Sequence, residues 1–291
     1  MSVDILQEKI RKCKNPSVLV LEAFADWIPP FLLAQENDLS KTFLTAYKTL
    51  LGALKGTVPA VRFGFGSFAL LGPEGLSVLS ELMKEAKSQG YYVLLDAPEV
   101  LSAISAQHAA AALSRTDSLY PCDGIVVSAY LGSDVIRPFA AACASGKTVF
   151  PAVRTANRSA PELQDLLTGA RLVHTAVADI ISRMGDANCG KCGYSQLGAL
   201  ASASAPDSLR SLRAKYKRMF LLLDGYDYPN ANAKNCSFAF DNLGHGAAAC
   251  AGSSIAAAWK QADSDGSDFA ELSVQEALRM KKNLTRYITV L

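Results

Sequence analysis

Short, continuously apolar runs recur along this chain, and each is followed by a polar or glycine-bearing end and a longer segment with helical periodicity. Runs that do not alternate between apolar and polar residues are typical of parallel strands covered on both faces. The runs predict eight strands, at residues 17–21, 58–63, 91–95, 124–127, 147–153, 197–201, 219–223 and 246–250.

Segments with apolar residues three and four positions apart lie between these runs and predict helices. They cover residues 39–55, 74–89, 100–113, 135–145, 161–181, 206–216 and 255–262. Eight strands that alternate with helices are typical of a (β/α)8 TIM barrel in the α/β class. We expect a single domain over residues 1–291, with a barrel core at about 15–262 and a C-terminal helix at about 273–283. A doubly wound open sheet is the alternative, but no Gly-x-Gly-x-x-Gly follows the first strand.

Composition narrows the class of protein further. Of the 291 residues 50% are hydrophobic, and 29 basic against 27 acidic side chains leave a net charge of +2. Binding of nucleic acid or of a membrane surface would need clustered Lys and Arg, so we expect neither. Seven cysteines, an odd number, fit a disulfide framework poorly. Without a signal-peptide core or an apolar stretch of ~18 residues, the sequence predicts a cytoplasmic protein.

The working face of such a barrel is the ring formed by the C-terminal ends of its strands. The polar residues there are candidate site residues: Glu22, Arg62, Asp96, Ser128, Arg154, Asp224 and Ser253. Charges at the ends of apolar strands are costly unless paired or solvated, so we expect Arg62 to pair with Glu22 or Asp96. Two interpretations stay open: a site for an anionic or hydroxylated small molecule, or a solvated ion-pair network that caps the barrel.

Four segments around these strand ends carry a family resemblance. They are residues 68–76 (FALLGPEGL), 129–134 (AYLGSD) with Pro138 and Phe139, 153–157 (VRTAN) continuing to 162–165 (ELQD), and 244–247 (GHGA) leading into 253–255 (SSI). In order and spacing they resemble the orotidine 5′-monophosphate decarboxylases of the bacterial long-chain branch, from about residue 10 to residue 262. The resemblance implies a (β/α)8 barrel, a homodimer with sites near the interface, and an ancestor that bound a nucleotide monophosphate.

The resemblance fails where that decarboxylation would be carried out. The family has an Asp-x-Lys-x-x-Asp motif after the third strand, in which the lysine protonates the developing carbanion. Here Asp96 matches the first aspartate, but Pro98 stands at the lysine position and Leu101 at the second aspartate. Glu22 matches the family's first-strand aspartate and Arg62 its second-strand lysine. Arginine keeps the charge, but a pKa above 12 makes it useless as a proton donor near neutral pH.

The phosphate-binding residues of the family are also replaced. The family has a Pro-Gly-x-Gly-x-Gln-Gly loop after the seventh strand, whereas residues 224–230 here are DGYDYPN, with Pro229 at the glutamine position. Ser253 stands at the family's arginine position. Asp224 and Asp227 would repel a phosphate, while Tyr226 in the same loop is a candidate to line a ligand cleft. Backbone N–H groups offer a residual anion site at Gly252, Ser253 and Ser254.

Cysteines and histidines are the other residue types with possible chemistry. Cys189 and Cys192 form a Cys-x-x-Cys, but no second pair completes a zinc site, so a thiol-bearing turn is favoured over a metal or redox role. His108, His174 and His245 are far apart in sequence and are expected to pack in the core or lie on the surface. We expect no metal and no cofactor.

The sequence therefore leads to three hypotheses. The first is a divergent member of the decarboxylase family that lacks decarboxylase activity and binds a small polar or nucleotide-like ligand through Glu22, Arg62, Asp96 and Asp224. The second is an active orotidine 5′-phosphate decarboxylase or other lyase in pyrimidine (UMP) biosynthesis, using Arg62 or an unforeseen lysine. The third is a non-catalytic dimeric regulatory or structural subunit.

Overall fold

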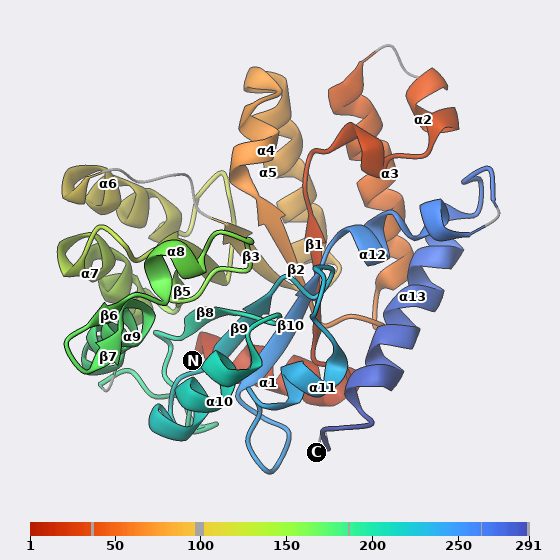
Figure 1. The fold of residues 1–291 in the computed structure, drawn as a ribbon. Coiled ribbons are helices and arrows are strands. Elements are labelled where there is room, and N and C mark those ends of the chain that lie inside the picture. The colour runs from red at the N-terminus through yellow and green to blue at the C-terminus, as the bar shows by residue number, and fades with distance from the viewer. Residues whose placement is uncertain (36–37, 97–101, 186, 263, 290–291) are drawn as a thin grey trace.

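Eight parallel strands form a closed barrel in the computed structural model, as the sequence predicts (Figure 1). The structure describes residues 1–291 except 36–37, 97–101, 186, 263 and 290–291. Around the barrel the strands run in the order β1-β10-β9-β8-β5-β4-β3-β2. They are β1 (Ser17–Leu21), β2 (Ala60–Gly64), β3 (Tyr92–Asp96), β4 (Gly124–Ser128), β5 (Thr148–Ala152), β8 (Ala199–Ser202), β9 (Leu221–Asp224) and β10 (Ala247–Ala251).

Both faces of these strands are buried, which explains their continuously apolar sequences. In β1, Val18 and Val20 belong to the cluster that fills the barrel, whereas Leu19 and Leu21 belong to the cluster between barrel and helices. The same alternation holds in β9, where Leu222 faces inward and Leu221 outward. Polar side chains, among them Asp96 and Asp224, occupy positions at the C-terminal ends of the strands.

Helices cover the outside of the barrel (Figure 1). Two of the longest, α3 and α5, pack against each other beside β1–β3. N-cap residues explain where two of the outer helices begin. Asp38 accepts hydrogen bonds from the amides of Ser40 and Lys41 at the start of α3, and Ser102 caps α6. The outer helices are α2 (Pro30–Gln35), α3 (Leu39–Leu54), α4 (Phe65–Ala69), α5 (Gly72–Ser88), α6 (Ala103–Ser114), α7 (Ser133–Ala142), α10 (Pro206–Lys215), α11 (Ala233–Ser237), α12 (Ser253–Ala256) and α13 (Phe269–Leu284).

One helix that the sequence analysis did not predict closes the N-terminal end of the barrel. In α1 (Ser2–Cys13), Val3, Leu6 and Ile10 pack into the cluster that fills the barrel. Ser2 Oγ and Tyr92 Oη lie 2.7 Å apart in a hydrogen bond. The folded chain therefore starts before the expected core limit at residue 15.

The single helix expected at residues 161–181 is wrong. The chain forms α8 (Pro161–Gln164), then a short antiparallel hairpin of β6 (Leu167–Thr168) and β7 (Arg171–Leu172), and then α9 (Val173–Gly185). Gly169 lies in the hairpin turn at a φ of +65°, which a residue with a side chain adopts only with strain. The apolar periodicity continues across this turn and hides it.

The C-terminal helix is longer than expected. The sequence places it at about residues 273–283, whereas α13 begins at Phe269 and ends at Leu284 and packs along α3 and α12. The expected helix at 255–262 is divided between α12 and a 3₁₀ turn at Ala258–Gln261. Among the described residues, no helix combines the length and apolar character that crossing a membrane requires.

Candidate functional site at the barrel mouth

Arg62 lies at the centre of the barrel mouth and joins two carboxylates from distant strands. It points inward from β2 and is only 6% exposed. Its Nε lies 3.1 Å from Asp96 Oδ2, which Nη2 also contacts, and its Nη1 lies 2.9 Å from Asp224 Oδ1. The expected ion pair with Asp96 is confirmed, and Asp224 on β9 is a second partner.

The two aspartates keep this arginine charged. Burial alone would lower the pKa of the guanidinium, but the nearby carboxylates of Asp96 and Asp224 more than offset it and raise the pKa well above the usual value. Arg62 therefore holds and orients carboxylates and cannot release a proton near neutral pH.

Glu22 occupies the neighbouring position at the end of β1. Ser67 Oγ donates a hydrogen bond of 2.5 Å to its Oε2. The carboxylate lies directly over Gly64, where an added Cβ would come within 1.8 Å of Oε2, so a side chain there would have to displace the Glu22 carboxylate. Burial raises the pKa of Glu22, and the Asp96 and Asp224 charges add to that shift, whereas Ser67 and Arg62 oppose it.

Asp227 takes up the position at which a residual anion site was expected. Its Oδ2 accepts a 2.6 Å hydrogen bond from the Gly252 amide and lies 3.5 Å from Ser253 Oγ. The indole of Trp27 covers the same glycine, because an added Cβ on Gly252 would lie 2.7 Å from its Cη2. The Ser254 hydroxyl is buried and has no hydrogen-bond partner in the described structure.

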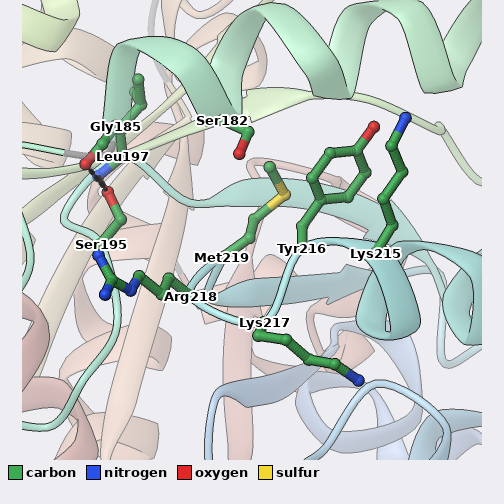
Figure 2. Close-up of a pocket in the computed structure, with 9 residues that line it drawn as sticks. All are labelled: Ser182, Gly185, Ser195, Leu197, Lys215, Tyr216, Lys217, Arg218 and Met219. Carbon is green, nitrogen blue, oxygen red and sulfur yellow. Dashed lines mark hydrogen bonds between the residues drawn. The ribbon is translucent and has the colours of Figure 1, made fainter.

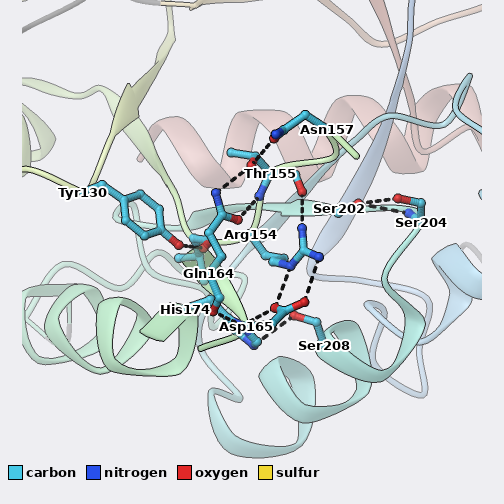
Figure 3. A network of polar contacts seen from close by, with 11 residues as sticks. Tyr130, Arg154, Thr155, Asn157, Gln164, Asp165, His174, Ser202, Ser204 and Ser208 are labelled. Carbon is cyan, nitrogen blue, oxygen red and sulfur yellow. Dashed lines mark hydrogen bonds and ion pairs between the residues drawn. The ribbon is translucent and has the colours of Figure 1, made fainter. Parts of the chain in front are cut away.

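Arg154, at the end of β5, belongs to a separate network between β5, α8, α9 and α10 (Figure 3). Its Nε and Nη2 bind both carboxylate oxygens of Asp165 at 2.9 and 3.0 Å, and its Nη1 donates to the Thr155 carbonyl at 2.6 Å. The Asp165 carboxylate also lies 3.1 Å from Nδ1 of His174. The structure thus does not bring Arg154 together with Arg62, Asp96 and Asp224.

The remaining candidates are distributed around the mouth. Ser128 is exposed at the end of β4. Tyr226 points toward α11 and α13, where it lines a cavity of about 450 Å³ with Asn232 and Asn283. Burial raises the pKa of Tyr226 to about 12. Pro98 and Leu101, on which the case against decarboxylation partly rests, lie outside the described residues.

The opposite end of the barrel carries a different cavity (Figure 2). It measures about 180 Å³ and lies where β8 and β9 begin, lined by Ser195, Leu197 and Met219 with Lys217 and Arg218 nearby. Active sites of (β/α)8 barrels lie at the C-terminal ends of the strands, so this cavity does not mark the site.

Two hydrogen bonds at the mouth are not predictable from the sequence. The hydrogen bond from Ser67 joins α4 to Glu22 at the end of β1, and the one from Gly252 joins the N-terminus of α12 to Asp227 in the loop after β9. The sequence contained one indication of the second, since Asp224 and Asp227 lie three positions apart in the loop that follows a strand. Only the barrel closure shows that Asp227 reaches an amide of the adjacent strand.

Several known proteins are similar to this chain. The orotidine 5′-phosphate decarboxylase of Petrotoga mobilis is 25% identical over 287 residues, covering 98% of both chains. That of Rhodopirellula baltica is 29% identical over 205 residues, 68% of this chain and 67% of that protein. The solved OMP decarboxylase of Leishmania donovani has a TM-score of 0.71 at 22% identity and covers 97% of this chain and 99% of that one. No family model matches the sequence.

Fold and site together define a (β/α)8 barrel protein whose polar residues converge on the C-terminal ends of the strands. The full-length relatives and the shared fold make the chain similar to the orotidine 5′-phosphate decarboxylase family.

Proposed function

We propose that the chain is a member of this family that has lost decarboxylase activity and binds a small polar ligand at the barrel mouth. The proposal rests on Arg62, which stands where the family has a lysine and has its guanidinium engaged by Asp96 and Asp224. In sequence, Pro98 stands at the position of the family's proton donor. Each lost catalytic group would cost ~2.7–4 kcal/mol of transition-state stabilisation, if an oxyanion-hole donor is a guide.

The geometry near Gly252 supports the loss of phosphate binding. A dianionic phosphate at this position would compete with the Asp227 carboxylate for the Gly252 amide and would meet its negative charge. Because remote phosphate binding contributes to orientation at the reacting centre, its loss would weaken catalysis as well as affinity.

The chemistry of the mouth favours a neutral, hydroxylated ligand such as a nucleoside. Arg62 binds one oxygen of each aspartate, and among the described residues Asp96 Oδ1 and Asp224 Oδ2 remain available as acceptors on side chains that are about one-third exposed. Carboxylate oxygens accept hydrogen bonds from hydroxyl groups, and they repel anions. Nucleic acid and membranes are not expected as partners.

A homodimer in the cytoplasm completes the proposal. Three exposed apolar side chains follow adjacent strands at the mouth: Leu70, Ile104 and Leu131, at 87%, 70% and 46% exposure. Apolar side chains gathered at one rim favour a protein partner, and the resemblance makes a second copy of the chain the expected one. The buried cysteines Cys122, Cys143, Cys236 and Cys250 are free thiols, in keeping with a reducing compartment.

The decisive experiment is a decarboxylation assay of the purified chain with orotidine 5′-monophosphate, run beside the Petrotoga mobilis relative. We expect no release of CO2 above background, while the relative turns over. Turnover by this chain at the relative's rate would overturn the proposal and establish an active decarboxylase. Thermal shifts provide the ligand test: uridine should stabilise the chain more than UMP does, and the reverse order would restore a phosphate site.

A further inference from the structure

A serine, a histidine and an aspartate beside the barrel mouth form a chain of hydrogen bonds (Figure 3). Ser208 Oγ on α10 lies 3.3 Å from Nε2 of His174 on α9. The Nδ1 of the same imidazole lies 3.1 Å from Asp165 Oδ1, and the ring is only 3% exposed. None of the three residues takes part in the Arg62 cluster.

The surroundings of His174 fix its tautomer. Its Nδ1 faces the Gln164 carbonyl at 3.0 Å and the Asp165 carboxylate, and both groups accept hydrogen bonds only. The neutral ring therefore carries its proton on Nδ1 and presents a lone pair at Nε2. Ser208 must donate its hydroxyl proton to that lone pair, which is the arrangement that activates a serine as a nucleophile.

Space and hydrogen-bond donors lie next to the serine. A cavity of about 380 Å³ is lined by Ser208, His174, Asp165 and Arg154. Ser208 is the third residue of the ten-residue helix α10. In the described part of the chain, the amides of Asp207 and Ser208 donate to no protein acceptor, so they are available to stabilise an oxyanion.

We propose that Ser208, His174 and Asp165 form a second site, with an activated serine that accepts acyl groups from small esters. The Ser208 oxygen attacks the ester carbonyl carbon, and its proton passes to His174 Nε2. The bond from that carbon to the alcohol oxygen then breaks, and the leaving alkoxide takes the proton from His174. Water attacks the acyl-serine by the same proton path and releases the carboxylic acid.

Arg154 and Asp165 would have positioning roles in this site. The bidentate ion pair fixes the Asp165 carboxylate, whose Oδ1 in turn orients the imidazole of His174. Arg154 holds both carboxylate oxygens of Asp165 in place. The imidazole of His174 therefore cannot rotate without losing its hydrogen bond to Asp165 Oδ1.

A fluorophosphonate probe tests the proposal on the intact protein, because it modifies activated serines irreversibly and mass spectrometry locates the adduct. We expect one adduct, on Ser208, and slow hydrolysis of p-nitrophenyl acetate with the same dependence on the serine. Ser208→Ala should abolish the labelling, and His174→Gln should slow it at least ~100-fold, the usual contribution of a general base. Ser211→Ala, which alters a serine lining the same cavity, is the matched control and should label normally.

A pair of cysteine variants keeps the test independent of whether His174→Gln folds. Iodoacetamide should alkylate Ser208→Cys at least tenfold faster at pH 7 than Ser211→Cys, since only the first thiol would face the imidazole. Absence of an adduct on Ser208, labelling that persists in Ser208→Ala, or equal alkylation of the two cysteines would each overturn the proposal.

Discussion

Arg62 is the residue on which the ion pairs of the barrel mouth depend. Its guanidinium is a delocalised cation that carboxylates bind on two sides. The buried guanidinium is paired with Asp96 and Asp224, so its removal would leave two carboxylates facing each other.

Replacing Arg62 with methionine should therefore destabilise the fold. Loss of one partner from a buried ion-paired group costs 3–5 kcal/mol, and we expect about 3 kcal/mol because the aspartates are partly exposed. Urea unfolding at pH 7 measures the change. Arg62→Lys keeps the charge and should cost less, and adding Asp96→Asn and Asp224→Asn to the methionine variant should recover part of the loss. Unchanged stability in Arg62→Met would contradict the described pairing.

At the scale of elements, α1 closes the N-terminal end of the barrel and is held there by polar contacts as well as by Val3 and Leu6. Asp4 Oδ1 accepts a 2.8 Å hydrogen bond from the Cys192 amide, in the Cys-x-x-Cys turn. Burial tends to raise the pKa of Asp4, but the hydrogen bonds from Cys192 and from the N-terminus outweigh it and lower the pKa to about 2.

A group with a depressed folded pKa stabilises the fold above its unfolded pKa and loses this contribution as the pH falls through the folded value. Asp4→Asn should thus cost about 1 kcal/mol at pH 7, after allowance for solvent screening. The difference from the parent should shrink between about pH 4 and pH 2. Urea unfolding across this range measures it. Glu271→Gln on the exposed face of α13 is the control, and a pH-independent effect of Asp4→Asn would refute the assignment.

The junction between β10 and α12 is also held by a hydrogen bond to a carboxylate, from the Gly252 amide to Asp227. A hydrogen bond to a charged acceptor contributes about 1.5–3 kcal/mol, so Asp227→Ala should lower the free energy of unfolding by about 2 kcal/mol. Asp227→Asn retains an acceptor oxygen and should lose less. Equal stability of the alanine variant and the parent in urea would show that the Gly252 amide finds another partner.

The sequence predicts the strands of this fold well and its helix breaks and loop contacts poorly. The eight strands were found because burial on both faces leaves a continuous apolar run, and their bounds shift by only one or two residues. The break at Gly169 was missed, because the apolar spacing of α8 and α9 stays in phase across it. The pairing of Arg62 with Asp96 followed from charge and topology, whereas the contact between Asp227 and Gly252 depends on loop conformation, which local sequence does not determine.

At the scale of the whole molecule, the exposed apolar side chains at the mouth predict self-association. Leu70→Asp combined with Ile104→Asp should shift the mass from dimer to monomer in light scattering, because charges would replace apolar contacts at the rim. Leu278→Asp, on α13 across the barrel from α6, is the control and should leave the mass unchanged (Figure 1). A monomeric parent protein at micromolar concentration would contradict the homodimer.

The pairing of β1 with β10 has a consequence for biosynthesis. Ser17 lies opposite Ala249, roughly 230 residues later in the chain. At ~5–20 residues per second, a ribosome needs on the order of 10–50 s to deliver the strand that covers this edge. Until then the hydrogen-bonding groups of β1 face nascent chain or solvent and can recruit other unpaired strands. Slower translation or a lack of chaperones should therefore lower the yield of soluble protein, while the stability of the purified protein should stay the same.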